Sequence, residues 1–398
     1  MEVLLKELLE MLETKEQEMI EIRRHLHENP ELSFEETETA KFIKNFYKDK
    51  ECKVTTDIGG QHGILVDIKG GLPGDMLAIR ADFDALPIHE EADVPFRSKV
   101  DGVMHACGHD AHTAYMLVLA ECLISVKDRL KGTVRIIHQP AEEVPPGGAI
   151  TMVKEGCLDG VSHVFGIHVI STMPTGVIAY HAGSVHTGRA TFKIKIQGKG
   201  GHGAVPHEAK DSILAGAEFV TGIQKIVSRK INPMDTVTVT IGSFDGRGTA
   251  NIIKDSVVLE GDIRMLKEES REIVEQEFRR ILEGVCIAND MTYELDYKND
   301  YKVCINDEAT TTRIVTALSE ANLQEVSSIV DCGAQSPSED FAYYAEKRPS
   351  CFFFVGAHEP GTEAYGHHHP KFRIDEKSLL ISSKAMAVAV LNYMEKGI

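Results

Sequence analysis

The residues best suited to chemistry in this chain are a thiol, several imidazoles and an adjacent pair of carboxylates. Such donors together suit a borderline divalent ion such as Zn²⁺, Mn²⁺ or Co²⁺. Because one carboxylate stands directly beside the other, Glu143 can hold the metal while Glu142 takes a proton from the attacking water. The pattern therefore predicts metal-assisted hydrolysis. In chain order the donors are Cys107, His109, Glu142, Glu143, His168 and the run His367-His368-His369.

These donors stand at the ends of predicted elements. Cys107 and His109 precede the apolar run 114–123, which predicts a helix whose N-terminal dipole favours a thiolate over a thiol. The carboxylate pair follows the β-branched run 132–139, and His168 follows the apolar run 161–167, so both follow predicted strands. Open α/β sheets bind ligands at such strand ends. A lone histidine or a Glu-Glu pair is usually a surface or hydrogen-bonded residue with no role in metal binding. Here the residue types, their order in the chain and their places at the ends of elements together favour a metal site.

Length and charge bound the classes of protein. A chain of 398 residues exceeds what one core usually supports, so we expect two domains. Hydrophobic residues make up 42% and charged residues 26%, which is typical of a globular enzyme. The net charge of −18 argues against nucleic acid or an anionic membrane as a partner. An anionic small-molecule substrate would need a locally positive pocket.

Cysteine use and hydropathy indicate the compartment. No stretch approaches the length of a transmembrane helix, and the acidic, amphipathic N-terminus is not typical of a signal peptide. The eight cysteines are scattered without Cys-x-x-Cys spacing, which is typical of reduced thiols that are mostly buried. We therefore expect a cytoplasmic protein.

The order of predicted elements indicates the fold. Helices and strands alternate up to about residue 186, which predicts an α/β domain with a mostly parallel sheet. Strand 190–197 then alternates with period two and begins a β-α-β-β-α-β order, the ferredoxin-like arrangement. The predicted helix 308–322 and strand 350–356 return to the α/β pattern of the first part of the chain. We expect a catalytic domain formed by residues 1–186 and 301–398, with an inserted domain at 187–300.

Several motifs in one order resemble a known family. The chain resembles the amidohydrolase branch of the aminoacylase/carboxypeptidase clan of dinuclear metallopeptidases, over nearly its whole length. That branch includes N-acyl-L-amino-acid amidohydrolases, hippurate hydrolases and auxin-conjugate hydrolases. The motifs that carry the resemblance are Arg80–Pro87, Met104–His112, Gln139–Glu143, Gly166-Ile-His168, Gly200–His207 and His368-His-Pro370.

The resemblance implies a zinc-aminopeptidase-like catalytic domain with two divalent metal ions, either Mn, Zn, Co or Ni. It assigns Glu142 as the general base and selects His368 from the histidine run, because the last ligand stands two residues before Pro370. Reasoning from the residues alone leaves all three histidines open. Asp84 matches a buried carboxylate behind the metal ligands, and Asp82, where peptidase relatives have a histidine ligand, is expected not to touch metal. The implied metal ligands are Cys107, His109, Glu143, His168 and His368.

The resemblance also implies that the inserted domain is a lid that binds substrate and forms a homodimer. His202, Asn251 and Arg264 match lid positions that bind the substrate carboxylate or polarise the carbonyl, and His202 would stabilise the oxyanion. Whether His202 serves its own subunit or the opposite one stays open. The alternative for Arg264 is a structural ion pair with Asp262 or Glu260.

We therefore predict a metal-dependent hydrolase of linear amide bonds, an aminoacylase or deacetylase. It would split N-acyl-L-amino acids into a carboxylic acid and a free amino acid. The acyl group, the amino acid and the metal stay open. One alternative is a dipeptidase or carboxypeptidase on the same scaffold. The other is a non-catalytic metal- or thiol-sensing binding protein, which Glu142 argues against because a binder needs no base beside its ligands.

Overall fold

The chain folds into two compact units, described here from a computed structural model that covers residues 2–60 and 62–396. The first unit comprises residues up to 185, 305–333 and those from 340 onward. The second unit comprises residues 186–304 and 334–339. The second unit is thus close to the predicted insertion at 187–300, but it also takes in a short segment that we had placed in the catalytic domain.

An eight-stranded sheet forms the centre of the first unit, in the order β1-β2-β4-β3-β5-β16-β6-β15. The pairs β4–β3, β3–β5, β5–β16 and β6–β15 are parallel, and the pairs β1–β2, β2–β4 and β16–β6 are antiparallel. The prediction of an α/β fold with a mostly parallel sheet is confirmed. The strands are β1 (Lys53–Ile58), β2 (Gly63–Lys69), β3 (Leu72–Asp82), β4 (Lys131–Gln139), β5 (Val161–Pro174), β6 (Val177–Tyr180), β15 (Ser328–Asp331) and β16 (Ser350–His358).

Helices cover both faces of this sheet. Helix α4 is buried on almost every side, and it packs against α2, α10 and strands β3 and β5. Successive strand residues point to opposite faces, so Phe353 joins the core beside α10 while Phe352 packs against Phe341 on the other face. The helices are α1 (Glu2–Thr14), α2 (Glu16–Glu28), α3 (Thr37–Phe46), α4 (His109–Ser125), α5 (Gly148–Lys154), α8 (Glu308–Ala321), α9 (Ala342–Ala345) and α10 (Lys377–Lys396), with a short 3-10 turn η1 (Lys127–Arg129).

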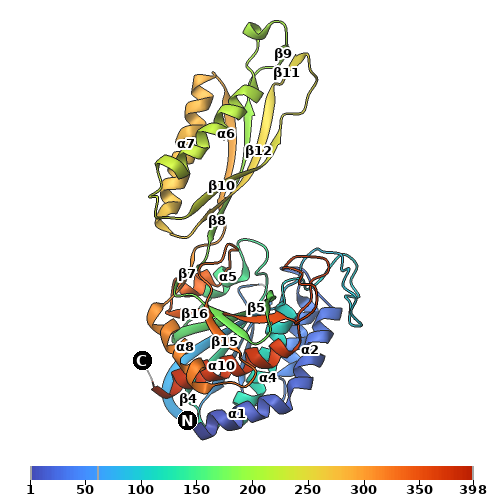
Figure 1. The fold of residues 1–398 in the computed structure, drawn as a ribbon, viewed down its shortest axis with the longest axis vertical. Coiled ribbons are helices and arrows are strands. Elements are labelled where there is room, and N and C mark those ends of the chain that lie inside the picture. The colour runs from blue at the N-terminus through green and yellow to red at the C-terminus, as the bar shows by residue number, and fades with distance from the viewer. Residues whose placement is uncertain (1, 61, 397–398) are drawn as a thin grey trace. The chain divides into compact units, whose positions relative to one another are not determined.

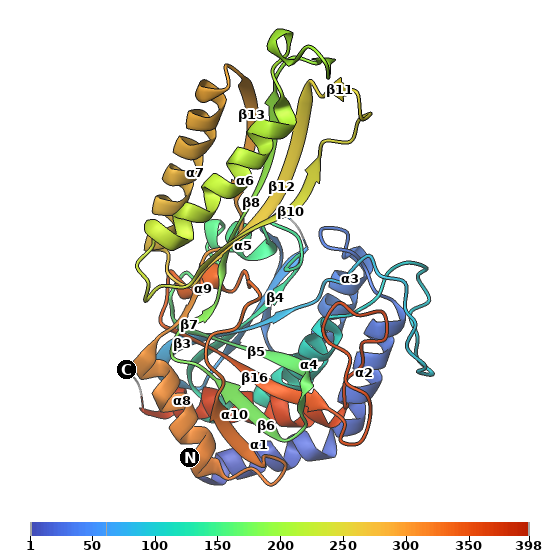
Figure 2. The ribbon, with the colours of Figure 1, turned by 45° about the horizontal axis from the view of Figure 1, so that its top comes forward.

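The second unit is a four-stranded antiparallel sheet in the order β10-β12-β8-β13. Helices α6 and α7 lie side by side on one face of it, where Phe219 and Phe278 are fully buried (Figure 2). The chain order is β-α-β-β-α-β, as expected for a ferredoxin-like arrangement. Its elements are β8 (Gly188–Gln197), α6 (Ser212–Arg229), β10 (Val237–Asp245), β12 (Ser256–Met265), α7 (Glu269–Ala288) and β13 (Thr292–Asn299), with the short β9 (Gly201–His202), η2 (Pro206–Glu208) and β11 (Ile252–Ile253). Two further short strands, β7 (Gly183–His186) and β14 (Cys304–Asn306), pair with each other.

Some elements were not predicted from the sequence. Strand β1 is polar and only partly buried, so its composition gives little strand signal. Helix α10 is buried on nearly all sides and carries serines in its interior, which weakens the amphipathic pattern by which a surface helix is recognised. Among the described residues, no helix is long and apolar enough to cross a membrane.

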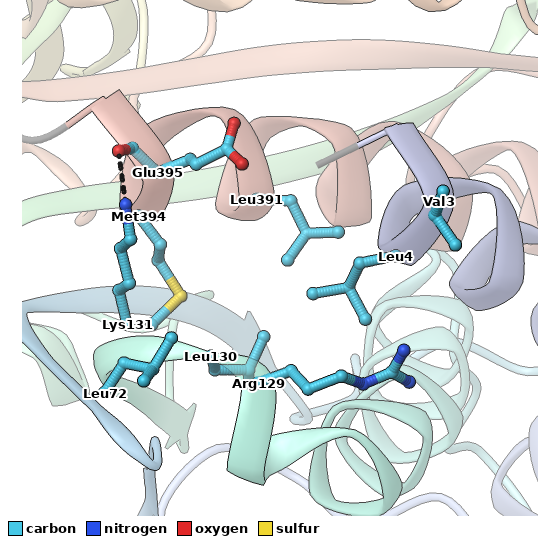
Figure 3. A pocket seen from close by; sticks show the side chains of 9 residues that line it. All are labelled: Val3, Leu4, Leu72, Arg129, Leu130, Lys131, Leu391, Met394 and Glu395. Atoms are coloured by element: carbon cyan, nitrogen blue, oxygen red, sulfur yellow. Dashed lines mark hydrogen bonds between the residues drawn. The ribbon is translucent and has the colours of Figure 1, made fainter.

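An apolar hollow of about 310 Å³ lies between α1, α10 and the start of β4 (Figure 3). Its lining includes Leu4, Leu130 and Leu391. Its two cations are already engaged, because Arg129 pairs with Glu7 and the Lys131 ammonium donates to the backbone oxygen of Glu395. The hollow lies at the N-terminal end of β4, so it is remote from the predicted site at the other end of that strand.

A buried guanidinium ties the ends of β3 and β4 to the turn before α9 in the first unit. Arg80 is 1% exposed and donates to Gln139 and Asp82, at 2.8 and 2.6 Å. It also donates to Asp340 at 2.9 Å, and Gln139 donates to the same carboxylate. Because Asp82 and Asp340 are fully buried, Arg80 balances charge that water cannot solvate.

We predict that Arg80→Met strongly destabilises the fold. Breaking a buried pair leaves its partner charge uncompensated, which costs about 3–5 kcal/mol of unfolding free energy. Thermal and urea unfolding measure the loss. The matched control is Arg129→Met, whose partner Glu7 is exposed, and it should leave the unfolding midpoint unchanged. Equal midpoints for both variants would contradict the role given to Arg80.

Candidate metal centre

The predicted ligands of the first unit come from neighbouring elements. Cys107 and His109 flank Gly108, which adopts a left-handed φ of 94° just before α4. A Cβ at Gly108 would lie 2.5 Å from a methyl group of Val169, so the turn needs glycine. Glu142 and Glu143 follow the end of β4, and His168 lies within β5. The prediction that the donors lie at strand ends is therefore confirmed for the two carboxylates, but it is wrong for His168, because β5 continues past it.

Donor atoms of these residues converge. Cys107, His109 and His168 offer atoms within 4.8 Å of one another, and so do Cys107, Glu143 and His368. The thiol sulfur lies 3.5 Å from His168 Nε2, and His368 Nε2 lies 3.2 Å from Glu143 Oε1. Metal–ligand bonds of about 2.0–2.3 Å in tetrahedral geometry separate donor atoms by roughly 3.3–3.8 Å. The spacing of these atoms therefore fits ligands that share an ion.

The ring of His109 is oriented by Asp84. His109 Nδ1 lies 3.0 Å from Asp84 Oδ1 and 3.1 Å from the backbone oxygen of Asp84, so Nδ1 carries the proton and donates. Burial acts to lower the pKa of His109, but the charge of Asp82 and the hydrogen bond to Asp84 raise it to about 10. The environment of Nε2 therefore favours a positive charge there.

His168 is oriented in the same sense by a backbone group. Its Nδ1 lies 2.8 Å from the backbone oxygen of Val169, so Nδ1–H donates and the Nε2 lone pair faces the Cys107 sulfur. Burial, followed by the neighbouring His112 and His367, lowers the pKa of His168 well below its usual value. A neutral imidazole with an available Nε2 is the form that binds a metal ion.

His112 is close to these donors but both of its ring nitrogens are engaged. Nδ1 lies 2.6 Å from Asp82 Oδ1, and Nε2 accepts from the backbone N–H of Val169 at 3.0 Å. Asp82 is engaged as well, because its other oxygen accepts from Arg80. His112 and Asp82 therefore support the ligands and are not expected to bind metal, in line with the expectation for Asp82.

The three consecutive histidines have different environments. His367 Nε2 accepts from the backbone N–H of Ser171, and its Nδ1 faces the Cys107 sulfur at 3.4 Å. His369 Nδ1 accepts from the backbone N–H of Lys371. His368 has a left-handed φ of 63° and a half-exposed side chain whose Nε2 faces Glu143. Of the three, His368 is the histidine that joins the carboxylate, which supports its selection as a ligand.

The electrostatics of Cys107 correct one expectation. Burial, followed by the charges of Glu143 and Glu142, raises the pKa of the Cys107 thiol well above its usual value. The expectation that the N-terminus of α4 favours a thiolate over a thiol is therefore not met by the protein groups alone. A bound divalent cation would supply the missing positive charge and deprotonate the sulfur.

Two buried polar atoms with unsatisfied hydrogen-bonding capacity indicate whether a cation fits this site. His109 Nε2 and Glu143 Oε1 are both buried and make no well-aligned hydrogen bond among the described residues, although His368 Nε2 lies 3.2 Å from Glu143 Oε1. His109 Nε2 and Glu143 Oε1 lie 3.9 Å apart. Buried polar atoms without partners are costly and need an explanation, which an ion between them would provide. The thiol, imidazole and carboxylate donors thus fit one or more borderline divalent ions.

Glu142 lies beside the proposed ligands, in a position suited to a general base rather than a ligand. Its side chain is 8% exposed, and its Oε2 lies 4.0 Å from His109 Nε2. The backbone N–H of its neighbour Glu143 donates to Asp84 at 2.9 Å, which fixes the local chain direction. A water held near His109 Nε2 would be within reach of the Glu142 carboxylate, as proton abstraction requires.

The predicted residues of the second unit fall into two places. His202 in β9 is exposed, and it pairs with Ile252 directly after Asn251. The backbone N–H of Gly203 donates to the Asn251 oxygen, so the structure brings His202 and Asn251 together. Arg264 lies near the far end of β12, eight residues beyond its first residue Ser256, or about 27 Å at about 3.4 Å per residue.

Arg264 makes the ion pair that we had named as its alternative role. Its Nε donates to Asp262 at 2.7 Å, and its Nη1 donates to the Ser338 hydroxyl at 2.8 Å. Glu260, the other alternative partner, pairs with Lys193 instead. These bonds hold the guanidinium in place, and its binding of a substrate carboxylate stays a prediction.

Sequence reasoning did not assign His112 and His367, which contact the ligands directly. His112 lies three residues after His109 in one helix, a spacing that places both rings on the same face, so the sequence held a usable signal. For His367 no comparable signal exists, because only the folded loop shows which histidine turns towards Cys107.

Comparisons with known proteins show the family to which this chain belongs. The model of Peptidase family M20/M25/M40 matches residues 78–392. N-acetyl-L-cysteine deacetylase of Bacillus subtilis is 39% identical over 372 residues, covering 94% of this chain and 87% of that protein. Thermostable carboxypeptidase 2 of Saccharolobus solfataricus is 37% identical over 381 residues, covering 95% and 96%.

A solved structure from the same family has a similar fold. The crystal structure of the Bacillus subtilis YXEP protein, described as a dinuclear metal binding peptidase from the M20 family, has a TM-score of 0.82 and 34% identity. The match covers 96% of this chain and 99% of that chain. The chain belongs to peptidase family M20/M25/M40. It is a hydrolytic enzyme that acts on amide bonds, as predicted from its motifs.

The histidine run offers a matched pair of variants. We predict that His368→Ala weakens Mn²⁺ or Zn²⁺ binding by at least about 100-fold, because even residues behind the ligands are worth about 10–100-fold. His369→Ala should bind metal like the parent protein, since its ring faces Tyr365 and Lys371. Isothermal titration of the metal-free variants measures both affinities. The reverse order of affinities would show that the wrong histidine was selected.

Proposed function

We propose that the chain hydrolyses the amide bond of N-acyl-L-amino acids, releasing a carboxylic acid and a free amino acid. The observation that carries this proposal is the buried Glu142 carboxylate 4.0 Å from the unsatisfied Nε2 of His109, next to a second carboxylate among the metal donors. The deacetylase relative, 39% identical over nearly the whole chain, supports the acyl amino acid as the substrate class.

We further propose that two divalent ions bind, through Cys107, His109, Glu143, His168 and His368. When bound, the ions supply Lewis acidity that polarises the scissile carbonyl and lowers the pKa of water. Cys107 belongs to two donor groups with converging atoms, one with His109 and His168 and one with Glu143 and His368, which supports two adjacent ion positions. The YXEP relative is described as dinuclear, which supports the same number.

The side chains of this chain would divide the reaction as follows. Glu142 accepts a proton from the attacking water and passes it to the leaving amine. Asp84 and the Val169 backbone keep His109 and His168 in the tautomers that face the donors. His202 donates to the oxyanion, and Asn251 and Arg264 bind polar groups of the substrate. Arg264 offers the fixed fork that suits a carboxylate, because Asp262 and Ser338 hold it still.

A carboxypeptidase activity is the second candidate. The relative from Saccharolobus solfataricus is named a thermostable carboxypeptidase and is 37% identical over nearly the whole chain. Both reactions share the amide bond and the free carboxylate of the product amino acid. They differ in the group on the acyl side of the scissile amide, which is an aminoacyl or peptidyl group for a carboxypeptidase and a simple carboxylic acyl group for an acyl-amino-acid hydrolase, so a paired substrate panel separates them. The cytoplasmic location stays a prediction, and the described cysteines are all free.

The test is turnover of N-acetyl and N-benzoyl amino acids against matched dipeptides, with protein reconstituted with Mn²⁺, Co²⁺ or Zn²⁺. We predict that the acyl amino acids turn over faster and that chelation abolishes the activity. Glu142→Gln should keep its metal and fold but lose about 10²–10⁴ in kcat, the usual worth of a general base. Normal turnover by this variant would remove Glu142 from its role, and preference for dipeptides would favour the carboxypeptidase.

We also propose a homodimer formed through the second unit. Both outer strands of its sheet are edges, but they differ in charge. Strand β13 carries Glu294, Asp296 and Lys298, which protect an edge from pairing, whereas β10 carries only Asp245 at its end. Pairing of β10 with its copy would give a two-fold dimer with a continuous sheet.

The separation within β12 supports a shared site. Asn251 lies in the chain shortly before β12, and His202 pairs with the neighbouring Ile252. Arg264, in contrast, lies about 27 Å along β12 from its first residue Ser256. That span is too long for one small substrate to touch both places. A dimer resolves this if His202 of one copy serves the active site of the other. The two ends of β12 then contribute to different substrates.

Mixing two inactive variants, His202→Ala and Glu142→Gln, tests this arrangement. Under subunit exchange, each mixed dimer should regain about one intact site, by the symmetry of a two-fold pair. The control mixes Glu142→Gln with Glu143→Ala, which damage the same unit and should not recover. Absence of recovery in verified mixed dimers would show that His202 serves its own subunit.

A further inference from the structure

The backbone segment that carries Glu142 is held by hydrogen bonds at consecutive peptide groups. Ala141 is fully buried and has a left-handed φ of 54°, a conformation unfavourable for a residue with a Cβ. Its backbone oxygen accepts from the N–H of Gly148 at 2.9 Å. On the other side of Glu142, the N–H of Glu143 donates to Asp84. The peptide groups before and after Glu142 are therefore both fixed.

A third bond comes from a carboxyl group with no assigned role. Glu36, directly before α3, is fully buried, and its Oε1 accepts from the backbone N–H of Ala141 at 2.8 Å. Its own chain segment also holds Asp84, because the Ser33 hydroxyl donates to Asp84 Oδ2 at 2.7 Å. The segment 33–36 thus contacts both groups that hold the Glu142-Glu143 pair, namely the Asp84 carboxylate and the Ala141 backbone.

We propose that Glu36 is a positioning residue that fixes the left-handed conformation of Ala141 and thereby the direction of the Glu142 side chain. With Glu36 in place, the peptide groups on both sides of the Ala141 Cα are held, and the torsions of Ala141 have no freedom to relax. Without it, the peptide group before Ala141 is free to rotate, and the side chain of the next residue, Glu142, changes direction. The inference rests on the proposed function, in which Glu142 is the base.

The chemical state of Glu36 tells which substitution should preserve the bond. Burial, followed by the nearby charge of Asp84, raises the pKa of Glu36 to about 8. Glu36 is therefore mostly a neutral acid at neutral pH, with one accepting oxygen and one O–H. A glutamine side chain has the same shape and still offers an accepting oxygen to Ala141.

The kinetic test compares Glu36→Met with Glu36→Gln. We expect Glu36→Met to lower kcat by about 10- to 100-fold, the usual effect of a displacement of about 1 Å at a reacting group, with little change in KM. Metal content should stay at the parent level, because Glu36 contacts none of the proposed ligands. Glu36→Gln should keep most of the parent kcat. Adding Ala141→Gly to Glu36→Met should recover part of the loss, because glycine adopts the left-handed conformation without strain.

Glu31→Met is the matched control, since Glu31 accepts from backbone N–H groups at the start of the same α3 but does not touch the Glu142 loop. It should lower thermal stability without lowering kcat. Equal loss of kcat in Glu31→Met and Glu36→Met, loss of metal in Glu36→Met, or a Glu36→Gln variant as slow as Glu36→Met would each overturn the proposal.

Amide hydrogen exchange separates this inference from the proposed function, because it needs no substrate. The Ala141 amide should exchange faster in Glu36→Met than in the parent and in Glu36→Gln. A parent protein that fails to hydrolyse acyl amino acids would refute the function but leave this exchange result intact. Unchanged exchange at Ala141 in Glu36→Met would refute the positioning role itself.

Discussion

The buried carboxylate of Asp84 is the interaction on which the rest of the site depends. One of its oxygens accepts from His109 Nδ1, and the other accepts from the backbone of Glu143 and the hydroxyl of Ser33. A single side chain thus sets the tautomer of an imidazole and the course of the carboxylate loop. Burial acts to raise the pKa of Asp84, but these hydrogen bonds outweigh it and lower the pKa, so the group stays charged.

Charge balance explains why the site favours a cation. Asp82 and Asp84 are fully buried, and Glu142 and Glu143 lie beside them with little exposure. Arg80 balances Asp82 and Asp340 on the inner side. On the outer side, no described lysine or arginine pairs with Glu143, whereas imidazoles and the Cys107 thiol surround it. Buried negative charge of this kind requires a counter-ion, and the donor atoms present are those that borderline divalent metals prefer.

Much of this was predictable from the sequence, for definite reasons. Strand and helix ends could be located from hydrophobic patterns, and so the donors at 107–109 and 142–143 could be expected to approach one another. The sheet class followed from the alternation of elements, and the family followed from several motifs in one order. The roles of Glu36 and Arg80 could not be predicted, because their contacts join segments far apart in the chain and depend on the backbone path of folded loops. The state of the Cys107 thiol was misjudged because local sequence shows the helix dipole but not the carboxylates that fold against it.

Anomalous diffraction from crystals loaded with Mn²⁺ or Zn²⁺ tests the central claim most directly. The account predicts two metal peaks about 3.5–4 Å apart, the usual separation in two-metal hydrolases, with the Cys107 sulfur bound and His112 left on Asp82. Peaks coordinated by Asp82 and His112, or metal bound without Cys107, His109 and Glu143, would contradict it.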